Sequence, residues 1–342
     1  MKYLEIILIL FISYFIYFLI NKFQIFHNLK KDHHQNFTHK KFILPVGGYY
    51  LIISLIIFNF LSIGLEIYYL IIIFIIGTLS DLKKFNSPKF RLIIQSILIL
   101  IFVYQSQIQI LSTRLDILDN LLSNFYFNIF FVSFCILIVI NGTNFIDGLN
   151  GLVLIYYLCI IFILFSSELN LQIFDNEFFF IELVATLSIL LVLNIFNKIY
   201  LGDSGSYLLG FLFSVILIKI YLINQFISPF FIVLLLWYPC FENLFSILRK
   251  YKYRKSPIKP DTKHLHQLLF YFLDSKLKFK NKLTNNNLSS FLINFFNLII
   301  FLVALSQITK TNVQVCLILL NVTIYLFIYS NLFKFRYNNL KK

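Results

Sequence analysis

Long apolar runs alternate with short polar segments along almost the whole 342-residue chain. Many runs approach the roughly 20 residues that an α-helix needs to cross about 30 Å of hydrocarbon. Segments of about ten residues with alternating polarity, typical of membrane barrels, do not occur in the sequence. The pattern predicts an all-α, polytopic integral membrane protein with about 11 transmembrane helices. The predicted spans are residues 3–21, 49–65, 67–79, 92–110, 125–141, 150–166, 178–195, 206–223, 228–247, 289–307 and 313–334.

The composition agrees with a membrane protein. Hydrophobic residues make up 59% of the chain and charged residues only 13%, whereas a soluble domain carries roughly 25% charged residues. If the N-terminus lies outside and the spans alternate, 25 of the 29 Lys and Arg residues fall in inner segments. Because basic loops stay on the cytoplasmic side, the predicted orientation is N-out/C-in. The net charge of +14 therefore reflects the inner loops and predicts no nucleic-acid partner.

One transmembrane domain, residues 1–342, is predicted. The longest segment between two spans, residues 248–288, is basic and too short for a separate domain. The second and third spans meet at Gly64-Leu65-Glu66, which predicts a tight hairpin. The four cysteines are isolated in or beside apolar runs, so we expect buried apolar side chains and no zinc site.

Four short polar segments interrupt the apolar pattern, and the predicted topology places all of them on the inner side. Carboxylates and imidazoles gathered at one membrane face indicate a metal-assisted reaction on a phosphorylated, lipid-linked substrate. The four segments, called here the polar motifs, are Ser80-Asp81, Asn144 to Asn150, Gly202 to Gly205, and His264-Leu265-His266.

The second and third motifs carry the candidate metal ligands. Two interpretations stay open for Asp203: a helix N-cap, or a ligand of Mg²⁺, which prefers one or two carboxylates together with substrate phosphates. Asn144, Asp147 and Asn150 recur every three residues, so in a helical turn they would share one face. An aspartate between two apolar helices is a candidate for function, because a charge near membrane depth is costly.

The first motif continues into basic residues. Asp81 is followed by Lys83, Lys89 and Arg91, which fit either an ordinary helix end with inner positive charge or a set of phosphate ligands.

The fourth motif carries two imidazoles. His264 and His266 lack the companions of a zinc site, and hydrogen bonds to a diphosphate suit their basic surroundings better. Glu242, inside the ninth span, needs a partner, for which Arg249 or Arg254 is predicted.

Read in order, these strings resemble the polyprenyl-phosphate N-acetylhexosamine-1-phosphate transferase superfamily. That superfamily includes phospho-MurNAc-pentapeptide translocase and the bacterial enzymes that start O-antigen, enterobacterial common antigen and teichoic acid synthesis. The strings that carry the resemblance are Pro45-Val46-Gly47-Gly48, Ser87-Pro88-Lys89-Phe90-Arg91-Leu92, Asn144 to Gly151, Gly202 to Ser206, and Ser256-Pro257 to His264-Leu265-His266.

The resemblance implies transfer of a HexNAc-1-phosphate from a UDP-sugar to undecaprenyl phosphate, with release of UMP, at the cytoplasmic face of the bacterial inner membrane. It implies a Mg²⁺ ion, with Mn²⁺ as an alternative, and a product that starts a lipopolysaccharide O-antigen or another cell-surface glycan. A homodimer is compatible with it. The implied roles are catalysis for Asp81 and Asp147, metal binding for Asp203 and Asp147, and substrate binding for Asn144, Asn150, Lys83, Lys89, Arg91, His264 and His266.

Three positions depart from the family pattern. Ser80 stands where the family usually has the first of two adjacent aspartates, Asn150 where many members have Asp, and Gln267 where a fuller His motif ends in His. The serine cannot act as a base at neutral pH, whereas the two amides still form hydrogen bonds. Two alternatives to an enzyme stay open: a transporter of lipid-linked sugars, and a non-catalytic relative.

Overall fold

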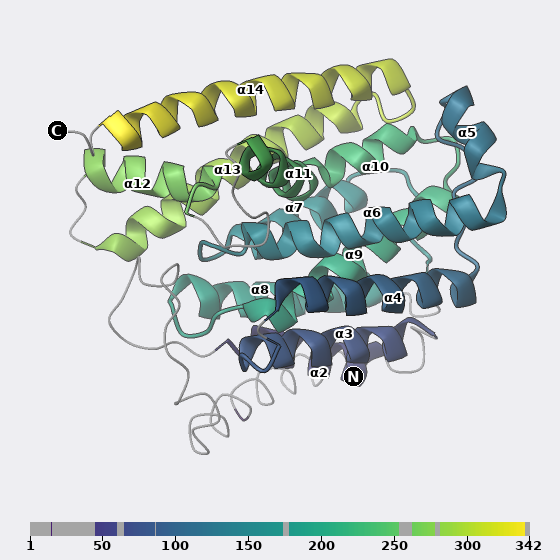
Figure 1. The fold of residues 1–342 in the computed structure, drawn as a ribbon, viewed down its shortest axis with the longest axis horizontal. Coiled ribbons are helices and arrows are strands. Elements are labelled where there is room, and N and C mark those ends of the chain that lie inside the picture. Colours follow the sequence, from purple (N-terminus) through teal and green to yellow (C-terminus); the bar gives the residue numbers. More distant parts are fainter. Residues whose placement is uncertain are drawn as a thin grey trace.

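All regular elements in the described part of the chain are helices. The computed structural model describes residues 45–59, 65–85, 87–173, 178–252, 262–277 and 281–338, together with residue 15. Figure 1 shows the long helices side by side, with α12 near one end of the bundle and α5 at the other. The helices are α2 (Gly47–Asn59), α3 (Glu66–Asp81), α4 (Pro88–Ser106), α5 (Asp116–Leu122), α6 (Phe125–Ile146), α7 (Leu152–Phe165), α8 (Phe179–Ile195), α9 (Gly202–Ile223), α10 (Pro229–Leu235), α11 (Trp237–Lys252), α12 (Leu265–Leu277), α13 (Lys282–Leu305) and α14 (Thr311–Asn338).

The helices follow the predicted spans from the second onward, whereas the first predicted span, residues 3–21, lies outside the described residues apart from residue 15. The predicted span 228–247 differs, because it is divided into α10 and α11, which meet at an angle of 72°. Pro239 in the first turn of α11 accounts for a break here, since proline lacks the N–H that would continue the helix from α10.

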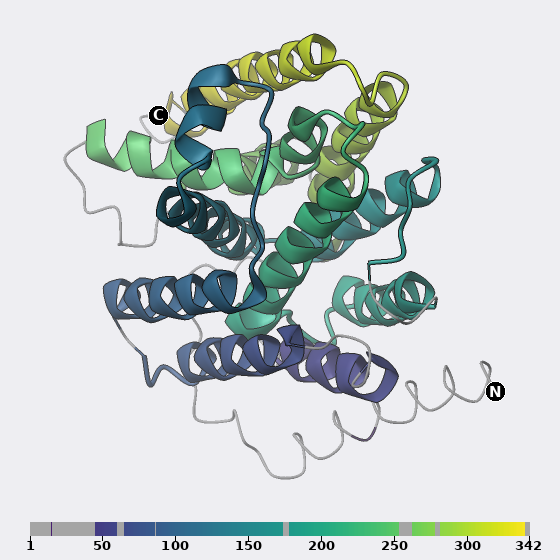
Figure 2. The same cartoon turned by 90° about the vertical axis from the view of Figure 1, so that its right-hand side faces the viewer.

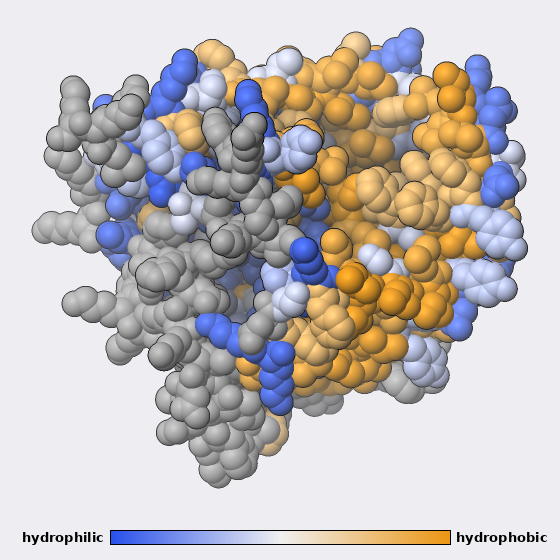
Figure 3. Space-filling model, viewed as in Figure 1, coloured by the Kyte–Doolittle hydropathy of each residue, from blue (hydrophilic) through white to orange (hydrophobic). Residues whose placement is uncertain are grey.

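The structure supports a polytopic membrane protein. Among the described helices, five are long and apolar enough to cross a membrane, or six if the bent pair is one span. Figure 3 shows a broad zone of apolar side chains, with polar side chains at its right-hand margin and further polar side chains toward the left. The total of eleven spans, the N-out orientation and the single domain stay predictions. The five helices are α4, α6, α9, α13 and α14.

Helix α9 lies at the centre of the bundle and packs against α2, α3 and α6. It is the teal-green helix that crosses the middle of Figure 2, and nearly all of its side chains are buried. Glycines allow its neighbours to approach closely: a Cβ on Gly77 of α3 would collide with the backbone of Ser204. The start of α9, where Asp203 lies, is therefore fixed by direct backbone contact.

Two polar contacts tie α3 and α9 together and define the two ends of the bundle. At one end, Asp81 of α3 accepts hydrogen bonds from the first turn of α9. At the other end, Glu66 pairs with Lys219 at 2.5 Å. The 16 residues of α3 separate these contacts by about 24 Å at 1.5 Å per residue. We call the end with Asp81 the motif end, and the end with Glu66 the opposite end.

Candidate functional site

The polar motifs, far apart in sequence, meet at the motif end, as predicted. Asp203 is the centre of this cluster. Its Oδ1 accepts a hydrogen bond from Asn144 Nδ2 at 2.8 Å, and its Oδ2 forms a 2.8 Å ion pair with Arg91. The Ser80 hydroxyl also donates to Oδ2. Three helices, α3, α4 and α6, thus deliver one side chain each to the carboxylate that α9 presents.

Asp81 contacts the start of α9, and its catalytic role stays a prediction. Its two carboxylate oxygens accept hydrogen bonds from the backbone N–H groups of Asp203 (2.8 Å) and Ser204 (3.0 Å). Helix α9 begins at Gly202 with φ of +77°, a conformation that favours glycine, and its own first residues supply no side-chain cap. Asp81 therefore caps α9 from a neighbouring helix, so the interpretation of Asp203 as an N-cap is wrong.

Asp147 lies at the end of α6, where the helical dihedrals stop (φ −75°, ψ 53°). Partial burial, followed by the negative charge of Asp203, raises the pKa of Asp147 to about 8. Two carboxylates that disfavour each other's charge form a site that a cation would stabilise. Their hard oxygen atoms suit Mg²⁺, which needs only one or two carboxylates when phosphates supply further ligands.

No complete metal cage is preformed in the described part of the chain. Within it, no three His, Cys, Asp or Glu side chains come together as a metal site. Asp203 has a cationic partner in the guanidinium of Arg91, which holds one of the oxygens that a metal ion would use. Asp203 and Asp147 therefore fit a metal site that is completed by substrate phosphates.

Asn150 does not share a helical face with Asn144 and Asp147, so that prediction is wrong. Because α6 ends at Ile146, the chain turns before Asn150. The buried Asn150 donates its backbone N–H to Asn286 Oδ1 at 2.8 Å and its Nδ2 to the Asn194 carbonyl at 2.9 Å. These contacts anchor the turn to α8 and α13 and give Asn150 a structural role.

The basic residues of the first motif differ in their exposure and contacts. Arg91, one turn into α4, reaches Asp203. Lys89 is exposed, and Lys83 is half-buried in a left-handed conformation (φ 55°). The ion pair with Asp203 brings Arg91 to the carboxylate cluster. The substrate-binding roles of Lys83 and Lys89 stay predictions.

The two histidines of the fourth motif lie at the start of α12, with parallel rings 5.6 Å apart. The His264 ring also stacks on Phe145 of the second motif, at 5.6 Å. His266 is fully buried beside Gly148, and neither of its ring nitrogens has a hydrogen-bond partner among the residues that the structure describes. Burial, with a smaller effect from His264, lowers the pKa of His266 to about 3, so this imidazole is neutral at physiological pH.

Gln267 explains one departure from the family pattern. Its side chain accepts a hydrogen bond from the His264 backbone N–H at 3.3 Å, three residues back at the helix start. This is the contact that a Gln or Glu makes in a capping box. The amide therefore helps to shape the turn that presents His264.

Glu242 has two partners that the sequence did not predict. Glu242 is fully buried and forms hydrogen bonds with His264 Nδ1 at 2.9 Å and with the Tyr325 hydroxyl at 2.6 Å. Arg249 instead donates to the Lys263 carbonyl and to the Tyr329 hydroxyl, and Arg254 lies outside the described residues. The sequence identified the need for a partner, but not Tyr325, which is remote in sequence and has no motif around it.

Comparisons with known proteins agree with the resemblance. Residues 64–221 match the model of glycosyl transferase family 4, a range that contains Asp81, Asn144, Asp147 and Asp203. The two matches support the resemblance to the polyprenyl-phosphate sugar-1-phosphate transferase superfamily. Over 237 residues it is 27% identical to the undecaprenyl-phosphate alpha-N-acetylglucosaminyl 1-phosphate transferase of Thermotoga maritima, an alignment that covers 68% of this chain and 69% of that relative.

Proposed function

We propose that this protein transfers a HexNAc-1-phosphate from a UDP-sugar to undecaprenyl phosphate at the cytoplasmic membrane face and releases UMP. The observation that carries the proposal is the convergence of Asp203, Asp147, Asn144 and Arg91 with the His264 motif at one end of an apolar bundle. Such a site is suited to anionic substrates, one of which is anchored in the bilayer. The superfamily and the named relative support the same chemistry.

In the proposed reaction, an oxygen of the lipid phosphate attacks the sugar-side phosphorus of the UDP-sugar. The bond from that phosphorus to the bridging oxygen breaks, and UMP leaves with the electron pair. The second pKa of a phosphate monoester is about 6, so the nucleophile is already ionised near pH 7 and needs no strong base. Ser80 in place of an aspartate is therefore compatible with turnover.

Because both reactants are anions, positioning and charge neutralisation are the main tasks of the protein. Asp203 and Asp147 would hold Mg²⁺, and a bound Mg²⁺ ion would neutralise part of the negative charge of the diphosphate. Arg91 offers a guanidinium that can pair with a phosphate oxygen in place of Asp203. Asn144 orients the Asp203 carboxylate, and His264 would donate to the phosphate of the departing UMP.

The test uses the purified protein in nanodiscs with undecaprenyl phosphate and a panel of UDP-HexNAc donors. We expect UMP release that depends on a divalent cation and that falls at least about 100-fold in Asp203→Asn, because a carboxylate aimed at the phosphates is lost. Asp119→Asn is the matched control, since Asp119 accepts hydrogen bonds from Ser112 and Thr113 near α5, away from the cluster. No UMP from any donor would refute the proposal and favour a non-catalytic relative or a transporter.

A further inference from the structure

We infer that Glu242 is a positioning residue for His264, holding the Nδ1 side of the imidazole so that Nε2 acts on the substrate. The inference rests on the proposed function and extends it to a residue outside the four polar motifs. Glu242 and Tyr325 belong to α11 and α14, beyond residues 64–221 that match the family model.

The geometry around Glu242 resembles the carboxylate that orients a catalytic histidine. Oε1 lies 2.9 Å from His264 Nδ1, and Oε2 accepts the Tyr325 hydroxyl at 2.6 Å, so both oxygens are engaged. A carboxylate beside Nδ1 keeps a proton on that nitrogen and stabilises the imidazolium, the form in which Nε2 also carries a proton and can donate to a phosphate oxygen. His264 then meets a departing phosphate with a defined ring nitrogen.

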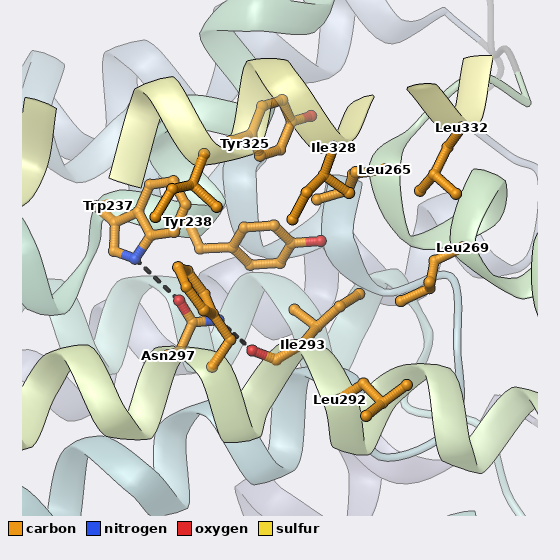
Figure 4. A pocket seen from close by; sticks show the side chains of 12 residues that line it. Trp237, Tyr238, Leu265, Leu269, Leu292, Ile293, Asn297, Tyr325, Ile328 and Leu332 are labelled. Carbon is orange, nitrogen blue, oxygen red and sulfur yellow. Dashed lines mark hydrogen bonds between the residues drawn. The ribbon is translucent and has the colours of Figure 1, made fainter. Parts of the chain in front are cut away.

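The surroundings make this pair strong. Glu242 is fully buried, and its neighbour Tyr325 is 2% exposed. Tyr325 lies on the wall of an apolar cavity of about 220 Å³ between α11, α12, α13 and α14, where Figure 4 shows it on α14 near Tyr238 of α11. In such apolar surroundings a hydrogen bond to a carboxylate is stronger than in water, and a lost partner is costly.

Stacked rings and Glu242 together fix the orientation of the His264 imidazole. The His264 ring stacks on Phe145 and on His266, and Nζ of Lys250 on α11 lies 5.7 Å from the Phe145 ring centroid. Stacking thus fixes the plane of the His264 ring, and the hydrogen bond to Glu242 restricts rotation of the ring within that plane. Among the described residues, the charged and titratable groups around His264 include Glu242, His266, Tyr325 through Glu242, Lys250, and Arg249 through the Lys263 carbonyl.

The test is a double-mutant cycle on UMP release in nanodiscs. Glu242→Gln is expected to lower kcat about 10- to 100-fold, as the loss of a partner that orients a histidine does elsewhere. If Glu242 acts through His264, Glu242→Gln combined with His264→Asn loses no more activity than His264→Asn alone. Losses that multiply in the double variant would overturn the inference, as would full activity in Glu242→Gln.

A matched control is Glu66→Gln, which removes another buried carboxylate of an ion pair, at the opposite end of the bundle. It is expected to lower thermal stability without changing kcat. If Glu242→Gln fails to fold, Tyr325→Phe removes only the second hydrogen bond and is expected to lower kcat by up to about tenfold. Unchanged kcat in a folded Tyr325→Phe variant would then overturn the inference.

A spectroscopic readout separates this inference from the proposed function. In protein with ¹⁵N-labelled histidine, the His264 signal, assigned by its loss in His264→Asn, is expected to show a protonated Nδ1 that changes in Glu242→Gln. A neutral ring protonated only on Nε2 would overturn the role of Glu242 even if the enzyme is active. Conversely, a wild-type protein without UMP release would refute the transferase, and the same spectra would still decide what Glu242 does.

Discussion

The capping role of Asp81 makes the most demanding prediction for the motif end. Asp81 accepts two hydrogen bonds from backbone N–H groups at the start of α9. Burial and the charge of Asp203 raise the pKa of Asp81, whereas the two N–H groups favour its charged form. With the carboxylate charged, each hydrogen bond contributes about 1.5–3 kcal/mol, and a negative charge at a helix N-terminus adds about 0.3–1 kcal/mol. Asparagine keeps one acceptor oxygen, so we expect Asp81→Asn to lower the free energy of unfolding by about 2 kcal/mol. Asp81→Ala leaves both N–H groups unpaired and is expected to cost about 3–6 kcal/mol.

Two measurements on the same preparation test this role. Thermal unfolding in detergent reports the stability, and UMP release at low temperature, where each variant is folded, reports the turnover. Asp81→Asn is expected to lower the unfolding midpoint clearly while keeping turnover within about tenfold of the wild type, because the carboxylate of Asp203 remains. An unchanged midpoint, together with a loss of turnover as large as in Asp203→Asn, would refute the cap and support the predicted catalytic role of Asp81.

Three further predictions concern the rest of the site. Gly148→Ala is expected to displace His266, because the new Cβ would collide with its Nε2, and to weaken UMP binding at least about tenfold. Isothermal titration calorimetry measures the affinity for UMP, and an unchanged affinity would contradict this role of the contact between Gly148 and His266. His266 is neutral when folded, with a pKa of about 3 against 6.5 when unfolded, so stability is complete above pH 6.5 and is lost as the pH falls toward 3. Between pH 7.5 and 5.5 this loss is about 1.4 kcal/mol, and urea unfolding at both pH values should show a smaller loss in His266→Gln. Ser80→Asp adds a carboxylate beside Asp203 and is expected to tighten Mn²⁺ binding, measured by electron paramagnetic resonance, whereas unchanged binding would show that residue 80 does not contact the ion.

The sequence by itself determined the class of the protein and most of the polar residues that meet at the motif end. Apolar length is a property of consecutive residues, so the spans could be predicted from residue 49 onward without any knowledge of contacts. The positions of the basic residues assign each loop to one side of the membrane. That assignment was enough to predict that Asp81, Asn144, Asp203 and His264 meet at one end.

Only the tertiary structure decided what each polar side chain does there. Asp81 became a helix cap because α3 and α9 lie antiparallel in contact, and Asn150 became an anchor because α6 ends before it. Glu242 paired with His264 and Tyr325, although arginines stand closer to it in sequence. Hydrogen bonds depend on distance in space, and residues 83 positions apart, as Glu242 and Tyr325 are, come together only through the packing of whole helices.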